Sequence, residues 1–125
     1  MLKQIILNAD DFAMNAAVSR GIINLARLDR LTATSAMILS PRWAADAVEL
    51  QEFKSQIDVG LHLDWTSPFA VEKGHGLSLN RGVLIAAFGG YNKSKARMVI
   101  EQQLDLFEQV WGSSPSHIDG HQHVH

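Results

Sequence analysis

Apolar residues occur along this chain in short runs that alternate with longer, helically spaced stretches. Four runs are short and apolar enough for buried strands, at 2–8, 34–39, 57–63 and from 116 to 119. Between them, apolar positions recur with helical spacing over 15–28, 43–53 and 94–111. Alternation of this kind predicts an α/β fold whose parallel strands are joined by right-handed crossovers.

Local signals mark the ends of the predicted helices. Asn15 is a suitable N-cap, Pro41 suits a first helical turn, and Gly112 suits a helix end. The segment 66–93 is long, polar, rich in glycine and weakly periodic. Because a loop of that length in a compact domain is usually functional or disordered, we expect it to face a substrate, with a short helix over 83–88.

Composition narrows the class of protein. The 125 residues carry a net charge of −2 and no Lys/Arg run, which disfavours nucleic acid or an anionic membrane as a partner. No apolar stretch approaches the roughly 20 residues of a membrane span, and no secretory signal is recognisable, so we expect a cytoplasmic soluble protein. With no cysteine, the candidate metal ligands are His, Asp and Glu.

Histidine is concentrated near the end of the chain, with four of the six histidines in 117–125. Packing explains this density poorly, whereas neutral imidazole is a common metal ligand. Asp10 and Asp11 end the first predicted strand. His62 lies near the end of the third, and His121 follows the fourth. Since the carboxyl ends of parallel strands share one edge, where ligands bind, these residues predict a metal-dependent hydrolytic site.

Each candidate also has a structural interpretation. Asp10 and Asp11 could form a cap or turn. Their adjacency would instead let one carboxylate bind the ion while the other accepts a proton from water. His62 alone could be a core histidine with one satisfied hydrogen bond. Asp64 would share a face with His62 in a strand, where it would orient that histidine or be exposed.

His121, His123 and His125 share one face if that segment is extended. They cannot all bind one ion that also has two other protein ligands and an open position for water. His121 is preferred because it directly follows the turn signal Asp119-Gly120. His125 is the reserve ligand, and His123 could line the pocket or orient a ligand. Asp119 could hydrogen-bond a ligand histidine or simply form the turn.

For the remaining histidines and tryptophans, the sequence gives weaker support for a functional role. His117 and His75 are expected on the surface or in packing contacts, although His75 could touch substrate. Trp65 could stack on a sugar ring or, equally, pack in the core. Trp111 ends the apolar face of a helix and is expected in the core.

The chain resembles the YdjC-like carbohydrate deacetylases, a family that includes chitooligosaccharide deacetylases and hopanoid-biosynthesis relatives. The resembling motifs occur in the family's order and cover the whole chain, at 8–12, 32–35, 59–63 and 117–125. The resemblance implies a (β/α) barrel-like fold, a divalent ion (Mg²⁺ or Zn²⁺), and removal of an N-acetyl group from a sugar with release of acetate. It implies Asp11, His62 and His121 as metal ligands and Asp10 as the general base.

Two features depart from the family pattern. Ala13 stands where the family usually has glycine, which strains the chain if that turn needs a positive φ. Family members are also about twice as long, near the roughly 250 residues of a full barrel. We therefore expect residues 1–125 to form one domain, the N-terminal portion of an incomplete barrel, lacking later pocket residues such as a histidine near the leaving group. An unpaired edge strand would favour a homodimer.

Three functions remain open at this point. The first is metal-dependent N-deacetylation of an acetylated sugar. The second is another metal hydrolase, of the amidohydrolase or phosphoesterase type, although those usually carry His-x-His on the first strand. The third is a non-catalytic metal- or sugar-binding remnant, which would bind metal without turnover.

Overall fold

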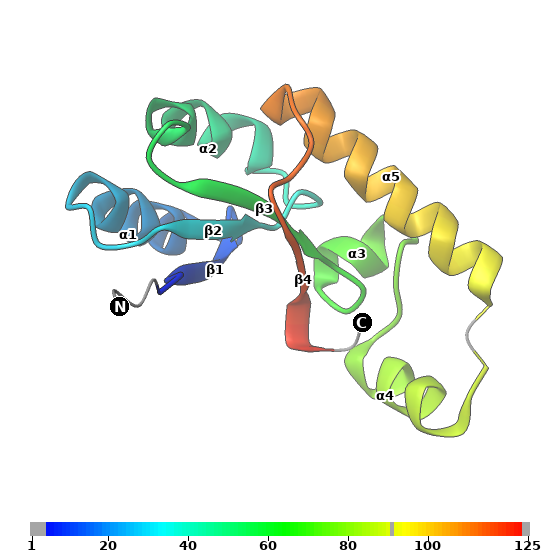
Figure 1. Ribbon diagram of the computed structural model, residues 1–125. Helices are drawn as coiled ribbons and strands as arrows, with labels where there is room; N and C mark the ends of the chain where they lie inside the picture. The colour runs from blue at the N-terminus through cyan, green and yellow to red at the C-terminus, as the bar shows by residue number, and fades with distance from the viewer. Residues whose placement is uncertain (1–4, 91, 124–125) are drawn as a thin grey trace.

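The computed structural model describes residues 5–90 and 92–123, which form a parallel sheet with helices joining its strands (Figure 1). The strands lie in chain order as β1 (Asn8–Phe12), β2 (Ala33–Ala36), β3 (Asp58–Leu63) and β4 (Ile118–Gly120). The helices are α1 (Ala16–Arg27), α2 (Trp43–Leu50), α3 (Pro68–Glu72), α4 (Leu79–Phe88) and α5 (Lys93–Trp111). Two 3₁₀ turns, η1 (Gln51–Phe53) and η2 (His121–His123), follow α2 and β4. The predicted α/β fold with parallel strands is confirmed.

The helix ends at Asn15 and Gly112 follow the signals in the sequence, whereas Pro41 lies before α2 and not in its first turn, because that helix begins at Trp43. The Asn15 side chain accepts hydrogen bonds from the backbone N–H groups of Ala17 and Val18, which starts α1. Gly112 adopts a φ of 79° and ends α5, a left-handed conformation that costs glycine nothing. Figure 1 shows α1, α2 and α5 in a row that follows the strand order.

The core lies between these helices and the sheet. Trp43 of α2 stacks on Phe107 of α5 with ring centroids 5.6 Å apart, and it meets Phe12 of β1 edge to face at 6.4 Å. Trp111 packs against the same tryptophan and is 4% exposed, as expected for a core residue. This aromatic cluster fixes α2 and α5 on the sheet, and thereby the carboxyl ends of the strands.

The first strand is not where the apolar pattern predicts it. Ile5, Ile6 and Leu7 precede β1 and are 57–79% exposed, while residues 2–4 lie outside the described residues. In the described part of the chain, β1 is an edge strand that pairs only with β2. The three apolar residues before it remain largely exposed, because no other described element covers them. The prediction of a buried strand over 2–8 is therefore wrong for its described part.

The segment after β3 is more helical than its composition suggests. It contains α3 and α4, and α4 begins at Leu79, four residues before the short helix expected at 83–88. Ser67 caps α3 by accepting from the backbone N–H of Ala70. Among the helices of the described residues, none is long and apolar enough to cross a membrane.

Candidate metal centre

Asp10 and Asp11 lie inside β1, at an irregularity in its pairing with β2. The register shifts between Ala9 and Phe12, and Asp11 has a φ of 64°. A bulge of this kind re-aims neighbouring side chains, so the two carboxylates face different partners. The prediction that Asp10 and Asp11 end the first strand is wrong, because β1 continues to Phe12. Ala13, which follows, has a φ of 70°, so the strain expected at that alanine is present.

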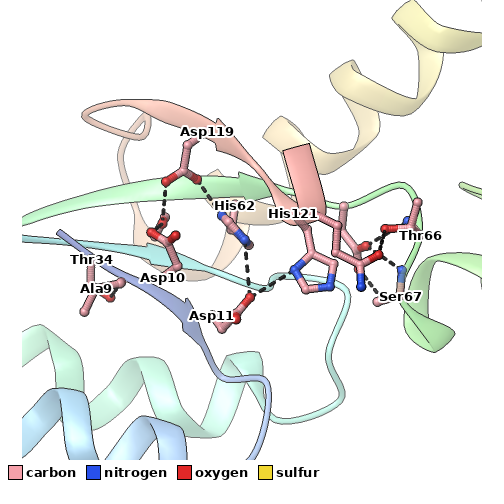
Figure 2. Close-up of polar contacts among 12 residues, drawn as sticks. Ala9, Asp10, Asp11, Thr34, His62, Thr66, Ser67, Asp119 and His121 are labelled. Atoms are coloured by element: carbon pink, nitrogen blue, oxygen red, sulfur yellow. Dashed lines mark hydrogen bonds and ion pairs between the residues drawn. The ribbon is translucent and has the colours of Figure 1, made fainter. Parts of the chain in front are cut away.

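Asp11, His62 and His121 converge from three separate parts of the chain (Figure 2). The Asp11 carboxylate oxygen Oδ1 lies 3.3 Å from His62 Nε2 and 3.0 Å from His121 Nδ1. The two histidine side chains are buried, whereas Asp11 is about one-third exposed. One candidate ligand atom from each residue falls within 4.8 Å of the others, so the three could hold a metal ion.

The sheet register positions the partner that orients His62. His62 on β3 lies opposite Asp119 on β4, and His62 Nδ1 is 2.6 Å from Asp119 Oδ1. In a neutral His62, the proton lies on Nδ1 because an ionised carboxylate only accepts, and the lone pair on Nε2 then faces Asp11 Oδ1. Two acceptors 3.3 Å apart repel each other unless a positive charge lies between them. The donor set therefore fits a cation.

Asp10 faces a separate group of polar side chains beside this centre. Asn8 Nδ2 donates to Asp10 Oδ1 at 2.6 Å, and the Ser35 hydroxyl lies 3.2 Å from the same oxygen. Ser35 also contacts Asp119 Oδ2, at 2.8 Å. Asp10, His62 and Asp119 form a second group that could hold an ion. Its carboxylates already accept these hydrogen bonds, whereas Asp11 contacts both histidines, so the first group is the stronger candidate.

The other histidines of the C-terminal cluster do not join the centre in the described chain. Asp119 and Gly120 belong to β4, so the turn predicted at these residues is wrong and the turn is η2. The other alternative for Asp119, a hydrogen bond to a candidate ligand histidine, is confirmed by its contact with His62. His123 in that turn is exposed, so it does not share a face with the buried His121. His125 lies outside the described residues.

Asp64 is fully buried, which contradicts one of its two predicted alternatives, that of an exposed residue. Its carboxylate accepts from the backbone N–H groups of Thr66 and Ser67 and from the Ser67 hydroxyl. It therefore organises the turn after β3 instead of orienting His62. His117, half-buried, packs over Gly60, where a Cβ would lie 2.4 Å from His117 Nε2.

Three polar residues near the site escaped prediction. Asn8 and Ser35 lie in the motif segments, but hydrophobic patterning gives such residues no role. Gln103 lies mid-helix in α5, fully buried, and its side-chain amide exchanges two hydrogen bonds with the backbone of Asp64. A buried glutamine cannot be told from a surface glutamine by type, although its place on the apolar face of α5 was a usable signal.

Comparison with known proteins gives a consistent result. A model of the YdjC-like protein family matches residues 4–125. The chain is 31% identical to carbohydrate deacetylase 2 of Listeria innocua over 94% of this chain and 49% of that protein. It is 30% identical to a chitooligosaccharide deacetylase of Escherichia fergusonii, over all of this chain and 51% of that protein. The chain thus spans about half the length of the curated relatives it matches.

A solved structure matches as well. It is the crystal structure of an Enterococcus faecalis protein named as a candidate cellobiose-phosphate cleavage protein, with a TM-score of 0.75 and 26% sequence identity. The match covers 95% of this chain and 48% of that one. The four parallel strands and their helices therefore correspond to half of that fold.

Proposed function

Because this chain belongs to the YdjC-like protein family, we propose that it removes an N-acetyl group from an amino sugar or oligosaccharide, in a metal-dependent hydrolysis that releases acetate. The observation that carries the proposal is the convergence of Asp11, His62 and His121 with a further carboxylate, Asp10, beside them. Relatives named as carbohydrate deacetylases support the substrate class. Residues 1–125 would then be one structural unit of such an enzyme.

Asp11, His62 and His121 are the proposed ligands of a divalent ion, with Mg²⁺ and Zn²⁺ both compatible with one carboxylate and two imidazoles. Such an ion would polarise the acetyl carbonyl and lower the pKa of a nearby water. Asp119 holds His62 through the 2.6 Å contact to Nδ1, which keeps Nε2 directed at Asp11. Asp119 is thus a positioning residue.

Asp10 is the proposed general base. Its carboxylate is exposed enough to meet substrate, and Asn8 and Ser35 restrict its orientation. It takes a proton from water while the water oxygen bonds to the acetyl carbon. When the C–N bond breaks, the leaving nitrogen needs a proton, which the protonated Asp10 can return. Acetate and a free amine result.

The test is acetate release from N-acetylated chitooligosaccharides by the purified chain, run in parallel with Mg²⁺, Zn²⁺ and EDTA. We expect release that EDTA abolishes. Asp10→Asn should remove turnover while metal remains bound, whereas Asp105→Asn, a change of an exposed carboxylate on α5, should alter neither. Loss of metal in Asp10→Asn would instead make Asp10 a ligand.

A second function is a metal- or sugar-binding unit without turnover. The observation that favours it is that Asp11, His62 and His121 could hold an ion among themselves, which requires no catalytic step. Stoichiometric metal binding with no acetate release from any acetylated sugar would support this function and reject deacetylation by the chain itself.

A further inference from the structure

The chain turns sharply from Asp11 onward, through a residue whose backbone conformation is unfavourable for its type. The N–H of Met14 donates to the carbonyl of Asp11 at 3.0 Å, which closes a four-residue turn. Ala13, the third residue of that turn, has a φ of 70°, whereas Phe12, the second, does not have a positive φ. This is the pattern of a type II turn, in which the third position favours glycine. Alanine therefore needs contacts from outside the turn to stay in this conformation.

We infer that Ser19 and Ser40 supply these contacts and so direct Asp11 at its two histidines. We call the pair the serine clamp. The two serines act through the backbone of Ala13, which makes them positioning residues. The inference rests on the proposed role of Asp11 as a metal ligand, and it adds residues that the sequence analysis did not single out.

Both polar backbone groups of Ala13 are bound by buried side chains. Its N–H donates to Ser19 Oγ at 3.1 Å, and its carbonyl accepts from the Ser40 hydroxyl at 2.6 Å. Ala13 is fully buried and the two serines are only 5–6% exposed, so water cannot replace either bond without opening the core. Rotation about φ or ψ of Ala13 would turn one of these groups away from its partner. The serine clamp therefore holds both backbone angles.

Further partners set the direction of each hydrogen bond in the clamp. Ser19 donates its only hydroxyl proton to Asp46 Oδ2 at 2.6 Å, which leaves an oxygen lone pair for the N–H of Ala13. Arg42 holds both oxygens of that carboxylate, through Nε at 3.1 Å and Nη2 at 2.8 Å. The backbone N–H of Arg42 also donates to Ser40 Oγ at 3.2 Å. Helix α1, helix α2 and the loop between β2 and α2 thus hold the turn as one network.

The shape of this turn determines where the Asp11 carboxylate lies. Asp11 has a positive φ of its own, and its Oδ1 lies 3.3 Å from His62 Nε2 and 3.0 Å from His121 Nδ1. If Ala13 relaxed to a negative φ, the Asp11 carbonyl would lose Met14 as its partner, and the carboxylate would turn with its backbone. The two histidines come from other parts of the chain and would not follow. Loss of the clamp would therefore separate the three proposed ligands.

The test deletes one hydroxyl of the clamp and compares the result with loss of a similar hydroxyl elsewhere. Ser40→Ala removes the hydrogen bond to the Ala13 carbonyl. Thr34→Val is the matched control, because the buried Thr34 hydroxyl donates to the Ala9 carbonyl at the same distance of 2.6 Å, on the other side of Asp11 (Figure 2). Calorimetry measures the affinity for Zn²⁺, and urea denaturation of the metal-free chain measures the free energy of unfolding.

Both substitutions should lower the free energy of unfolding by similar amounts, because each leaves one carbonyl in or next to β1 without its partner. Only Ser40→Ala should also weaken Zn²⁺ binding, by about tenfold, the lower end of the loss that follows removal of a group orienting a metal ligand. Ser19→Ala should weaken it in the same direction. A Ser40→Ala chain that binds Zn²⁺ as tightly as Thr34→Val would overturn the clamp.

A second background separates positioning from a general loss of stability. Glycine adopts a φ of 70° without steric cost, so in Ala13→Gly the turn keeps its shape without help from the serines. Adding Ser40→Ala to Ala13→Gly should therefore leave the Zn²⁺ affinity nearly unchanged, a non-additive result in the double-mutant cycle. A tenfold loss that persists in the glycine background would contradict the inference, since it would not depend on the strained alanine.

The outcome is separable from the proposed chemistry. Loss of Zn²⁺ affinity in Ser40→Ala but not in Thr34→Val, without acetate release by the unmodified chain, would support the clamp and reject deacetylation. Acetate release that EDTA abolishes, with equal Zn²⁺ affinity in the two variants, would support deacetylation and reject the clamp. An unmodified chain that binds no Zn²⁺ would overturn the ligand role of Asp11 and the clamp with it.

Discussion

Gln103 ties α5 to the end of β3, and replacing it tests how much the site depends on a buried amide. Its Nε2 donates to the Asp64 carbonyl at 2.7 Å, and its Oε1 accepts from the Asp64 N–H at 3.0 Å. Gln103 is fully buried, as is Asp64, so water cannot replace either bond without opening the core. Gln103→Leu keeps a side chain of similar size and removes both hydrogen bonds.

The expected loss of stability follows from the two backbone groups left without partners. Each buried unsatisfied donor or acceptor costs about 1–3 kcal/mol, which gives a total of about 2–6 kcal/mol. Burial of the apolar leucine side chain offsets part of this lost stability, at most about 2 kcal/mol in a site shaped for an amide. Taking the middle of that range, about 4 kcal/mol, less the contribution of leucine, we expect a net destabilisation of about 2 kcal/mol, a large fraction of the total stability of a small domain.

Urea denaturation measures the free energy of unfolding of Gln103→Leu and of Gln102→Leu. The control changes the neighbouring residue, which is exposed on the same helix, and should stay within about 0.5 kcal/mol of the unmodified chain. The slope of the unfolding free energy against urea should not change, because both variants unfold from the same packed state. A Gln103→Leu chain as stable as Gln102→Leu would refute the reasoning.

Three shorter predictions concern the site and its support. Asp119→Asn should weaken Zn²⁺ binding by about 10–100-fold in calorimetry, because it removes the charge that holds the neighbouring imidazole; unchanged affinity would reject its positioning role. Gly60→Ala should lower the melting temperature, since its Cβ would lie 2.4 Å from His117 Nε2, whereas Gly21→Ala in open helical space should not. Zn²⁺ at 100 times its dissociation constant should raise the unfolding free energy by about 2.7 kcal/mol, and His121→Gln should largely remove that gain; a gain that persists would place the ion elsewhere.

The helices could be predicted closely because their limits are encoded locally. The bounds of α1 and α5 agree with the predicted ranges within one residue at each end, since Asn15 and Gly112 act on their own backbone. The position of the first strand could not be predicted, because an apolar run indicates burial but does not say which other elements are present to cover it. Ile5 to Leu7 are apolar and exposed, while Asn8, Ala9 and Phe12 pair with β2.

The convergence of Asp11, His62 and His121 could be predicted without any side-chain geometry. Parallel strands deliver their carboxyl ends to one edge whatever their register, so three distant segments had to meet there. The role of Asp119 could not be decided in this way, because it depends on the register between β3 and β4. Only the pairing of His62 with Asp119 turns a candidate turn residue into the acceptor that orients the histidine.

Backbone strain gives a separate argument for the same site. In the part of the chain that the structure describes, five non-glycine residues have a positive φ, and four of them lie close in sequence to Asp11 or His121: Asp11 itself, Ala13, Gln122 and His123. Each such conformation costs about 1–3 kcal/mol and persists where surrounding contacts hold it. The fold therefore retains strained backbone at Asp11 and directly after both Asp11 and His121, where a relaxed chain would aim these two side chains differently. That placement depends on neither charge nor family resemblance, and it favours a site shaped for chemistry over a chance meeting of polar side chains.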